Sequence, residues 1–124
     1  MSTDRRILLE RAPNPAIALD YLTMLDGMAA AVQTRITIRY IPGKDMLTPA
    51  SFRRYLDALA KNAEQSLEQL AIVILDDFNN EIVPRWVQIR LTRQRTGEPD
   101  HHVLFEDRQP NWDNPALLAR LERF

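Results

Sequence analysis

The chain has 124 residues, of which 45% are hydrophobic and 27% charged, and its formal net charge is −1. This length and composition are typical of one globular domain, and the near-neutral charge gives no field that would attract nucleic acid or an anionic membrane. The chain contains no cysteine, which excludes disulfides, a thiolate nucleophile and cysteine metal ligands from its own residues.

Segments for membrane insertion or export are not expected either. The apolar run near the N-terminus is too short for a signal peptide, and the longest apolar run is Leu70–Leu75. A membrane span needs about 20 such residues. Together with the lack of cysteine, this favours a cytoplasmic protein with no membrane partner.

The first segment is predicted to be an arm. Pro13 and Pro15 flank Asn14, and regular structure is not expected there because proline fixes φ and lacks an amide hydrogen. The predicted organisation is an arm at residues 1–15, a domain at 16–109 and a tail at 110–124 that carries a short amphipathic helix at 116–123.

Two strands are predicted next. Residues 16–25 are apolar and predict the first strand, and Asp26-Gly27 is a turn signal, although residues 28–31 also suit a helix. Residues 32–40 alternate regularly and predict the second strand. Its apolar face carries Val32, Thr34, Ile36, Ile38 and Tyr40, and its cationic face carries Gln33, Arg35, Thr37 and Arg39.

Two helices follow the Pro42-Gly43 stop. Thr48 is predicted as the N-cap of the first helix, with Pro49 at its first position. Ser66-Leu67-Glu68-Gln69 matches a capping box and predicts the start of the second. The run Leu70–Leu75 alone would also suit a buried strand, but the cap and a length of about 17 residues favour a helix. Its predicted apolar stripe is Leu67, Leu70, Ala71, Ile74, Phe78 and Ile82.

Two further strands complete the pattern, at residues 86–93 and 101–106, after Val83-Pro84 ends the helix. The β-β-α-α-β-β order predicts an α+β fold with a four-stranded antiparallel sheet and two helices on one face. The opposite face carries Arg35, Arg39, Gln88 and Arg90 and needs water or a partner. Because open sheet edges need protection, and joining subunits edge to edge into a barrel would provide it, we expect a homo-oligomer.

The segment Ile41–Leu56, IPGKDMLTPASFRRYL, resembles the joint between the second strand and first helix of a known family. This family is the NADPH-dependent cyano-deazaguanine (nitrile) reductases of queuosine biosynthesis, in the tunnelling-fold (T-fold) superfamily. Pro13-Asn14-Pro15 is similar to the opening of that family, and Pro84-Arg85-Trp86-Val87 to the entry into its third strand. The resemblance covers roughly residues 13–106 and implies the tunnelling fold.

The chain departs from that family at its catalytic positions. The family's nucleophilic cysteine, which forms a thioimide with the nitrile, sits between the first two strands, but the corresponding connection here, about 26–31, has none. The cofactor motif E-S-K-S-L/F-K is matched by Thr48-Pro49-Ala50-Ser51-Phe52-Arg53. Ser51 matches the motif and Arg53 keeps its basic character, so these two are the candidate cofactor-binding residues. No catalytic residue is assigned. NADPH is expected only if the chain is an active enzyme.

Glu68 is the candidate ligand-binding residue. Counting back from Pro84, the family's His-Glu pair falls at Leu67-Glu68, so only the glutamate is present. The resemblance implies that a buried glutamate here anchors the N–H edge of a purine or pterin, which a carboxylate can accept with two oxygens. The alternative is a carboxylate that merely stabilises the helix N-terminus.

Other charged groups favour structural roles. Asp76, Asp77 and Glu81 are predicted to form a solvated helix face. His101 and His102 point to opposite faces of a strand and cannot chelate one metal as a strand pair, so no metal is expected. The strip formed by Arg35, Arg39 and Arg90 is expected to meet solvent or a neighbouring subunit.

Three hypotheses follow. The first is a degenerate, nitrile-reductase-like tunnelling-fold protein that binds a purine- or pterin-like heterocycle at a subunit interface. The second is an active enzyme of queuosine or pterin metabolism with different chemistry. The third is a structural or protein-interaction module with no small-molecule ligand. None of them includes nucleic acid or a membrane as a partner.

Overall fold

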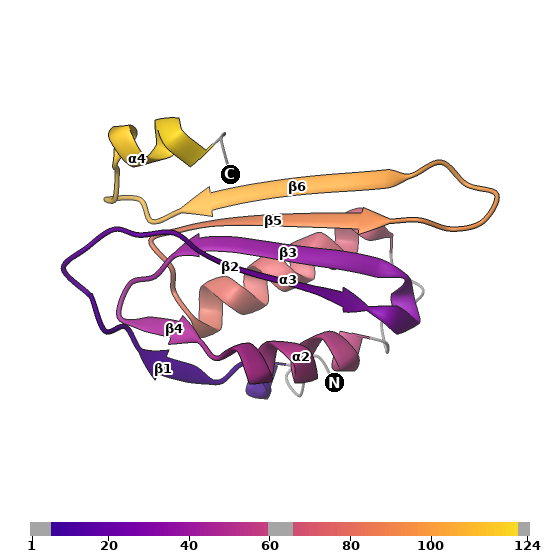
Figure 1. Ribbon diagram of the computed structural model, residues 1–124, viewed down its shortest axis with the longest axis horizontal. Coiled ribbons are helices and arrows are strands. Elements are labelled where there is room, and N and C mark those ends of the chain that lie inside the picture. The colour runs from indigo at the N-terminus through magenta and orange to yellow at the C-terminus, as the bar shows by residue number, and fades with distance from the viewer. Residues whose placement is uncertain (1–5, 60–65, 122–124) are drawn as a thin grey trace.

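A computed structural model describes residues 6–59 and 66–121 of the chain (Figure 1). Its main sheet is antiparallel with strand order β2-β3-β5-β6, and β1 and β4 form a separate two-stranded sheet. The predicted β-β-α-α-β-β order is confirmed for this sheet and its two helices. The strands are β1 (Arg11–Pro13), β2 (Thr23–Ala29), β3 (Thr34–Ile41), β4 (Asp45–Leu47), β5 (Trp86–Arg93) and β6 (His101–Arg108), and the helices are η1 (Ala30–Val32), α2 (Pro49–Ala58), α3 (Leu67–Glu81) and α4 (Pro115–Arg120).

The core lies between the main sheet and helices α2 and α3. Alternate residues of β3 and β5 point into this core, as the two-residue repeat of a strand predicts. The bounds of β5 are those predicted from the sequence. The apolar stripe of α3 is also buried. The fully buried strand residues on this face include Ile36, Ile38, Tyr40, Val87, Ile89 and Leu91.

The predicted first strand is wrong in its position. The structure places β2 at Thr23–Ala29, so that Asp26 and Gly27 pair with Thr37 and Ile36 in mid-strand rather than forming a turn. The chain reverses later, through η1. A Cβ atom at Gly27 would lie 2.5 Å from Leu56 Cδ1, so glycine at this position lets α2 pack close to β2.

Residues 16–22 instead form an irregular segment held by polar contacts. Asn14 Oδ1 accepts hydrogen bonds from the Ala16 amide and the Tyr21 hydroxyl. Arg85, the residue before β5, donates to the carbonyl oxygens of Ile17 and Leu19. These contacts satisfy backbone and side-chain groups that a strand would otherwise pair.

The prediction of no regular structure around Pro13 is wrong, because a short strand forms there. Residues Arg11–Pro13 form β1, which pairs with β4 in antiparallel register from Arg11 opposite Leu47 to Pro13 opposite Asp45. Proline is tolerated here because this ladder has only two strands and leaves an open side.

The two helix starts differ in their capping. Helix α2 begins at Pro49 as predicted, but the Thr48 side chain makes no cap hydrogen bond, and its buried Oγ1 has no hydrogen-bond partner among residues 6–59 and 66–121. The capping box of α3 is confirmed, because Ser66 Oγ accepts from the Gln69 amide at 3.1 Å and Gln69 Oε1 accepts from the Ser66 amide at 3.1 Å.

Helix α4 packs on the opposite face of the sheet from α2 and α3. Leu117 and Leu121 contact Ile41 and Trp86, and Arg39 Nη1 donates to the Leu121 carbonyl at 3.0 Å. The predicted tail helix extended to residue 123, which lies outside the described residues. Within residues 6–59 and 66–121, no helix has the length and apolar character needed to cross a membrane.

Candidate functional site

A pocket lies at the end of the main sheet where β5 ends and β6 begins. Its volume is about 480 Å³. Helix α3 starts at this same end of the molecule (Figure 1), and its first turn forms one wall. The lining residues are Ser66, Leu67, Gln69, Arg93, Arg95, Glu98, Pro99 and His101.

Glu68 stands beside this pocket on the first turn of α3. Its Oε2 lies 3.0 Å from Nε2 of His101, which lines the pocket, and the two side chains are 55% and 46% exposed. The pKa of Glu68 is lowered, first by a hydrogen bond from its own backbone N–H and then by His101. Glu68 is therefore an ionised acceptor, but it is exposed rather than buried as the resemblance implied.

Arg93 is a pocket residue that the sequence analysis did not single out. It is 6% exposed, its Nε donates to Thr34 Oγ1 at 3.0 Å, and its Nη2 has no hydrogen-bond partner among the described residues. Burial lowers the pKa of Arg93, as does Arg95, while Glu98 and Glu68 act in the opposite direction. The signal was present in the sequence, because the alternation of β5 places Arg93 on the face of Val87, Ile89 and Leu91.

Ser51, a candidate cofactor residue, is 0% exposed. Its Oγ donates to the Thr48 carbonyl at 2.9 Å and accepts from the Glu10 amide at 3.2 Å. The hydroxyl therefore fixes the first turn of α2 against the N-terminal segment.

Arg53, the other cofactor candidate, is exposed next to edge strand β2. Its Nη2 donates to the Met28 carbonyl at 2.6 Å and pairs with Asp57 at 2.8 Å. Glu68 lies instead next to β6, the opposite edge of the sheet. Within one chain, Arg53 and Glu68 therefore lie at opposite edges of the sheet. Their contact residues, Met28 and His101, lie at the same end of the strands.

The two histidines diverge as predicted. His101 contacts Glu68 on the helix side, whereas His102 Nδ1 lies 3.2 Å from Thr92 Oγ1. The described part of the chain contains no cluster of three or more His, Cys, Asp or Glu side chains that could hold a metal ion.

The prediction of a solvated acidic face on α3 is wrong for Asp77. Asp77 is 3% exposed and accepts from the Tyr55 hydroxyl at 2.6 Å, while Asp76 is exposed and Glu81 pairs with Arg6 at 2.6 Å. Adjacent helical residues are rotated by about 100°, so one of the two aspartates faces α2 and the other faces water.

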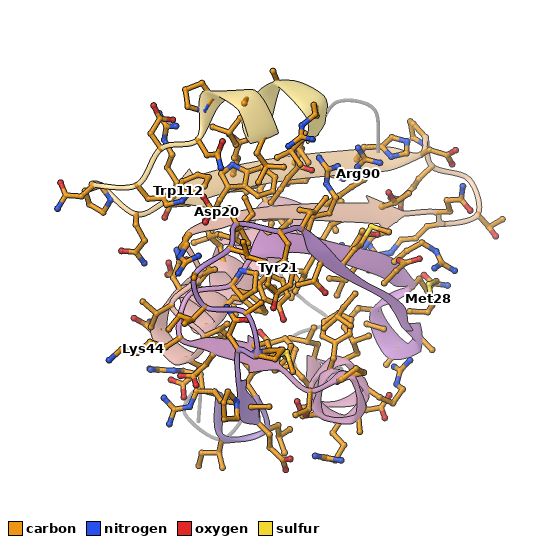
Figure 2. The ribbon with its side chains drawn as sticks, turned by 60° about the vertical axis from the view of Figure 1, so that its left-hand side comes forward. Asp20, Tyr21, Met28, Lys44, Arg90 and Trp112 are labelled. Carbon is orange, nitrogen blue, oxygen red and sulfur yellow. The ribbon has the colours of Figure 1, made fainter. Side chains whose placement is uncertain are left out.

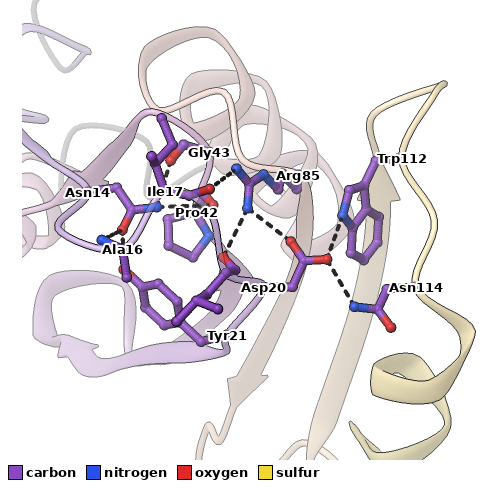
Figure 3. Close-up of polar contacts among 11 residues, drawn as sticks. Asn14, Ala16, Ile17, Asp20, Tyr21, Pro42, Gly43, Arg85, Trp112 and Asn114 are labelled. Carbon is purple, nitrogen blue, oxygen red and sulfur yellow. Dashed lines mark hydrogen bonds and ion pairs between the residues drawn. The ribbon is translucent and has the colours of Figure 1, made fainter.

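A polar cluster around Asp20 lies at the other end of the molecule from Met28 (Figure 2). Asp20 accepts hydrogen bonds from Arg85 Nη1 at 2.9 Å, Trp112 Nε1 at 3.2 Å and Asn114 Nδ2 at 2.9 Å (Figure 3). Burial alone would raise the pKa of Asp20, but these hydrogen bonds and the Arg85 charge lower it. The cluster joins the segment of Asp20, Arg85 just before β5 and the segment of residues 112–114, so we assign it a role in stability.

The fold and the element order define a protein of the tunnelling-fold class. The family model described as "QueF-like protein" matches residues 33–112, and the chain therefore belongs to the QueF-like family. The matched range contains Glu68, Arg93 and His101 but excludes β1, the irregular segment at residues 16–22, β2 and α4.

The fold is also similar to a solved structure described as the archaeosine synthase QueF-Like in the apo form. The TM-score is 0.51 at 18% sequence identity, over 71% of this chain and 90% of that one. At this identity the likeness concerns the fold alone. No significant match exists among curated proteins.

Proposed function

We propose that this chain binds a purine- or pterin-like heterocycle beside Glu68, at an interface between two copies, without reducing nitriles by the thioimide route. The observation that carries the proposal is the ionised, accessible carboxylate of Glu68 at the edge of a pocket. A carboxylate accepts two parallel N–H groups, and guanine-like and pterin rings present such a pair. Membership of the QueF-like family supports the same ligand class.

The two edge strands of the main sheet, β2 and β6, support the proposed interface. Neighbouring strands in the order β2-β3-β5-β6 alternate in direction, so β6 of one copy and β2 of a rotated second copy run antiparallel. Met28 lies near the end of β2 and His101 at the start of β6, at the same end of the sheet. Edge pairing would therefore bring Arg53 of one copy towards Glu68 of the next, and supports a homo-oligomer with composite sites.

The chemistry proposed for the site is binding rather than catalysis. The thioimide route needs a cysteine, and the chain has none. Ser51 is already engaged by Thr48 and Glu10, so the proposal includes no cofactor. The proposed location is the cytoplasm.

The test is a thermal-shift screen of the purified protein with 7-cyano-7-deazaguanine, guanine, urate, a pterin and NADPH. A ligand at 100 times its dissociation constant stabilises the folded state by about 2.7 kcal/mol. We expect a heterocycle to give this shift with the wild type and with Glu106→Gln, a matched change on the other face of β6, but not with Glu68→Gln. No shift with any compound on a folded sample would favour a structural or protein-interaction module.

A further inference from the structure

The pocket beside Glu68 contains a buried positive charge with unused hydrogen-bonding capacity. Arg93 is 6% exposed and lines the pocket, yet its Nη2 has no hydrogen-bond partner among the described residues. Buried charged groups are nearly always paired, because leaving their donors unsatisfied costs free energy. An anion bound in the pocket would balance the charge of this guanidinium group.

The surroundings add to the positive potential. Arg95 lines the same pocket two residues further along the chain, and the pocket wall includes the first turn of α3, a helix of 15 residues. A helix N-terminus carries a partial positive charge that favours anions. This contribution is secondary, since Ser66 and Gln69 already satisfy some of its amide groups.

Two carboxylates partly offset this positive charge. Glu98 lines the pocket and Glu68 lies beside it, and both interact electrostatically with Arg93. Neither is a hydrogen-bond partner of Arg93 Nη2, and Glu68 is engaged by His101. The pocket thus combines acceptors at its edge with guanidinium donors, an arrangement suited to a ligand that has both N–H groups and an anionic group.

We propose that the heterocycle bound beside Glu68 is a nucleoside phosphate, whose phosphate group is bound by Arg93 and Arg95. This inference rests on the proposed function, since it assumes that Glu68 binds the base. Guanidinium groups suit this task because their planar N–H pairs match two phosphate oxygens.

The test is titration calorimetry at low ionic strength with guanosine, guanosine monophosphate and pyrophosphate. We expect the nucleotide to bind at least about tenfold more tightly than the nucleoside, a difference that is readily measured. Arg95→Gln should remove most of this preference and leave guanosine binding unchanged. The control Arg11→Gln removes the same charge from an exposed arginine that does not line the pocket, and it should keep the preference. Arg95 is used first because it is only half-buried, whereas Arg93→Gln could disturb the core.

The outcomes separate the two proposals. Guanosine binding that requires Glu68, with no preference for the nucleotide, would overturn the phosphate site and leave the proposed function standing. A preference that survives both Arg95→Gln and Arg93→Gln would also overturn it. Pyrophosphate binding that Arg95→Gln weakens, without binding of any heterocycle, would support the anion site and contradict the proposed function. No binding of any compound would overturn both.

Discussion

His101 Nε2 lies 3.0 Å from Glu68 Oε2, and this contact joins the first residue of edge strand β6 to the first turn of α3. The carboxylate that we propose as the ligand acceptor therefore already has a partner within the chain. A ligand that needs both carboxylate oxygens must compete with His101 for one of them.

This competition predicts that His101→Ala strengthens heterocycle binding. The gain should be a few-fold, because polar contacts between exposed side chains contribute little in water. The urea midpoint should stay near that of the wild type, since both side chains are about half exposed. Calorimetric affinities of His101→Ala and of the control His102→Ala, on the opposite face, check this; weaker binding in His101→Ala would show that the histidine supports the site.

The capping box of α3 predicts a measurable stability loss for Ser66→Ala. This change removes the acceptor of the Gln69 amide and uncouples the reciprocal bond to the Ser66 amide. The expected cost is about 1 kcal/mol in the free energy of unfolding. Urea unfolding measures it against Thr96→Ala in the exposed β5–β6 loop, and equal midpoints for the two variants would contradict the role of the cap.

Asp20→Asn is predicted to destabilise the fold in a pH-dependent way. The charged carboxylate accepts hydrogen bonds from three residues in two distant segments, and losing the charge should cost about 1–3 kcal/mol at neutral pH. Because the folded pKa of Asp20 is lowered, its contribution is present above the unfolded value of about 3.9 and is lost as pH falls through the folded value.

The gap between wild type and Asp20→Asn should therefore be constant from about pH 7 to pH 5 and shrink below pH 4. Urea unfolding over this range measures it, with the exposed Asp76→Asn as the control. A gap that widens on acidification would mean that the carboxylate is not held in its charged form.

Val83 is predicted to be a strained position. It is a β-branched residue at φ 52°, and its side chain is exposed, so it has little packing to lose. Val83→Gly removes about 1–2 kcal/mol of strain from the left-handed backbone conformation. The greater entropy of glycine in the unfolded chain costs about 0.5–1 kcal/mol of stability, which is less than this gain. A rise in the melting temperature is expected for Val83→Gly but not for Val83→Ala, and a fall in both variants would exclude strain at this site.

The sequence predicted the parts of the fold that local signals determine. Strand β5 and the capping box at Ser66 depend on alternation and on a four-residue motif. The start of the first main-sheet strand was missed because Asn14 and Arg85 hold residues 16–22 through contacts that no local pattern reveals. Gly27 was misread as a turn because its need for close helix packing is a tertiary property.

The candidate site was predicted only in part. Glu68 came from a family resemblance, but its contact with His101 spans 33 positions and required the fold. Arg93 interrupts an apolar face, a signal that becomes meaningful only when its Nη2 is seen to lack a partner among the described residues. Asp77 was assigned to solvent because the sequence does not show which helix face meets α2.

The most direct test of the central claim, a binding site shared between two copies, is a mixing experiment with Glu68→Ala and Arg53→Ala. Each variant alone should fail to bind the heterocycle, because each lacks one half of every site. If the two are unfolded together and refolded at equal amounts, random assembly should restore about one quarter of the wild-type sites, measured as ligand stoichiometry by calorimetry. No restored binding in mixed oligomers, or full binding by Arg53→Ala alone, would contradict a composite site at the paired edges.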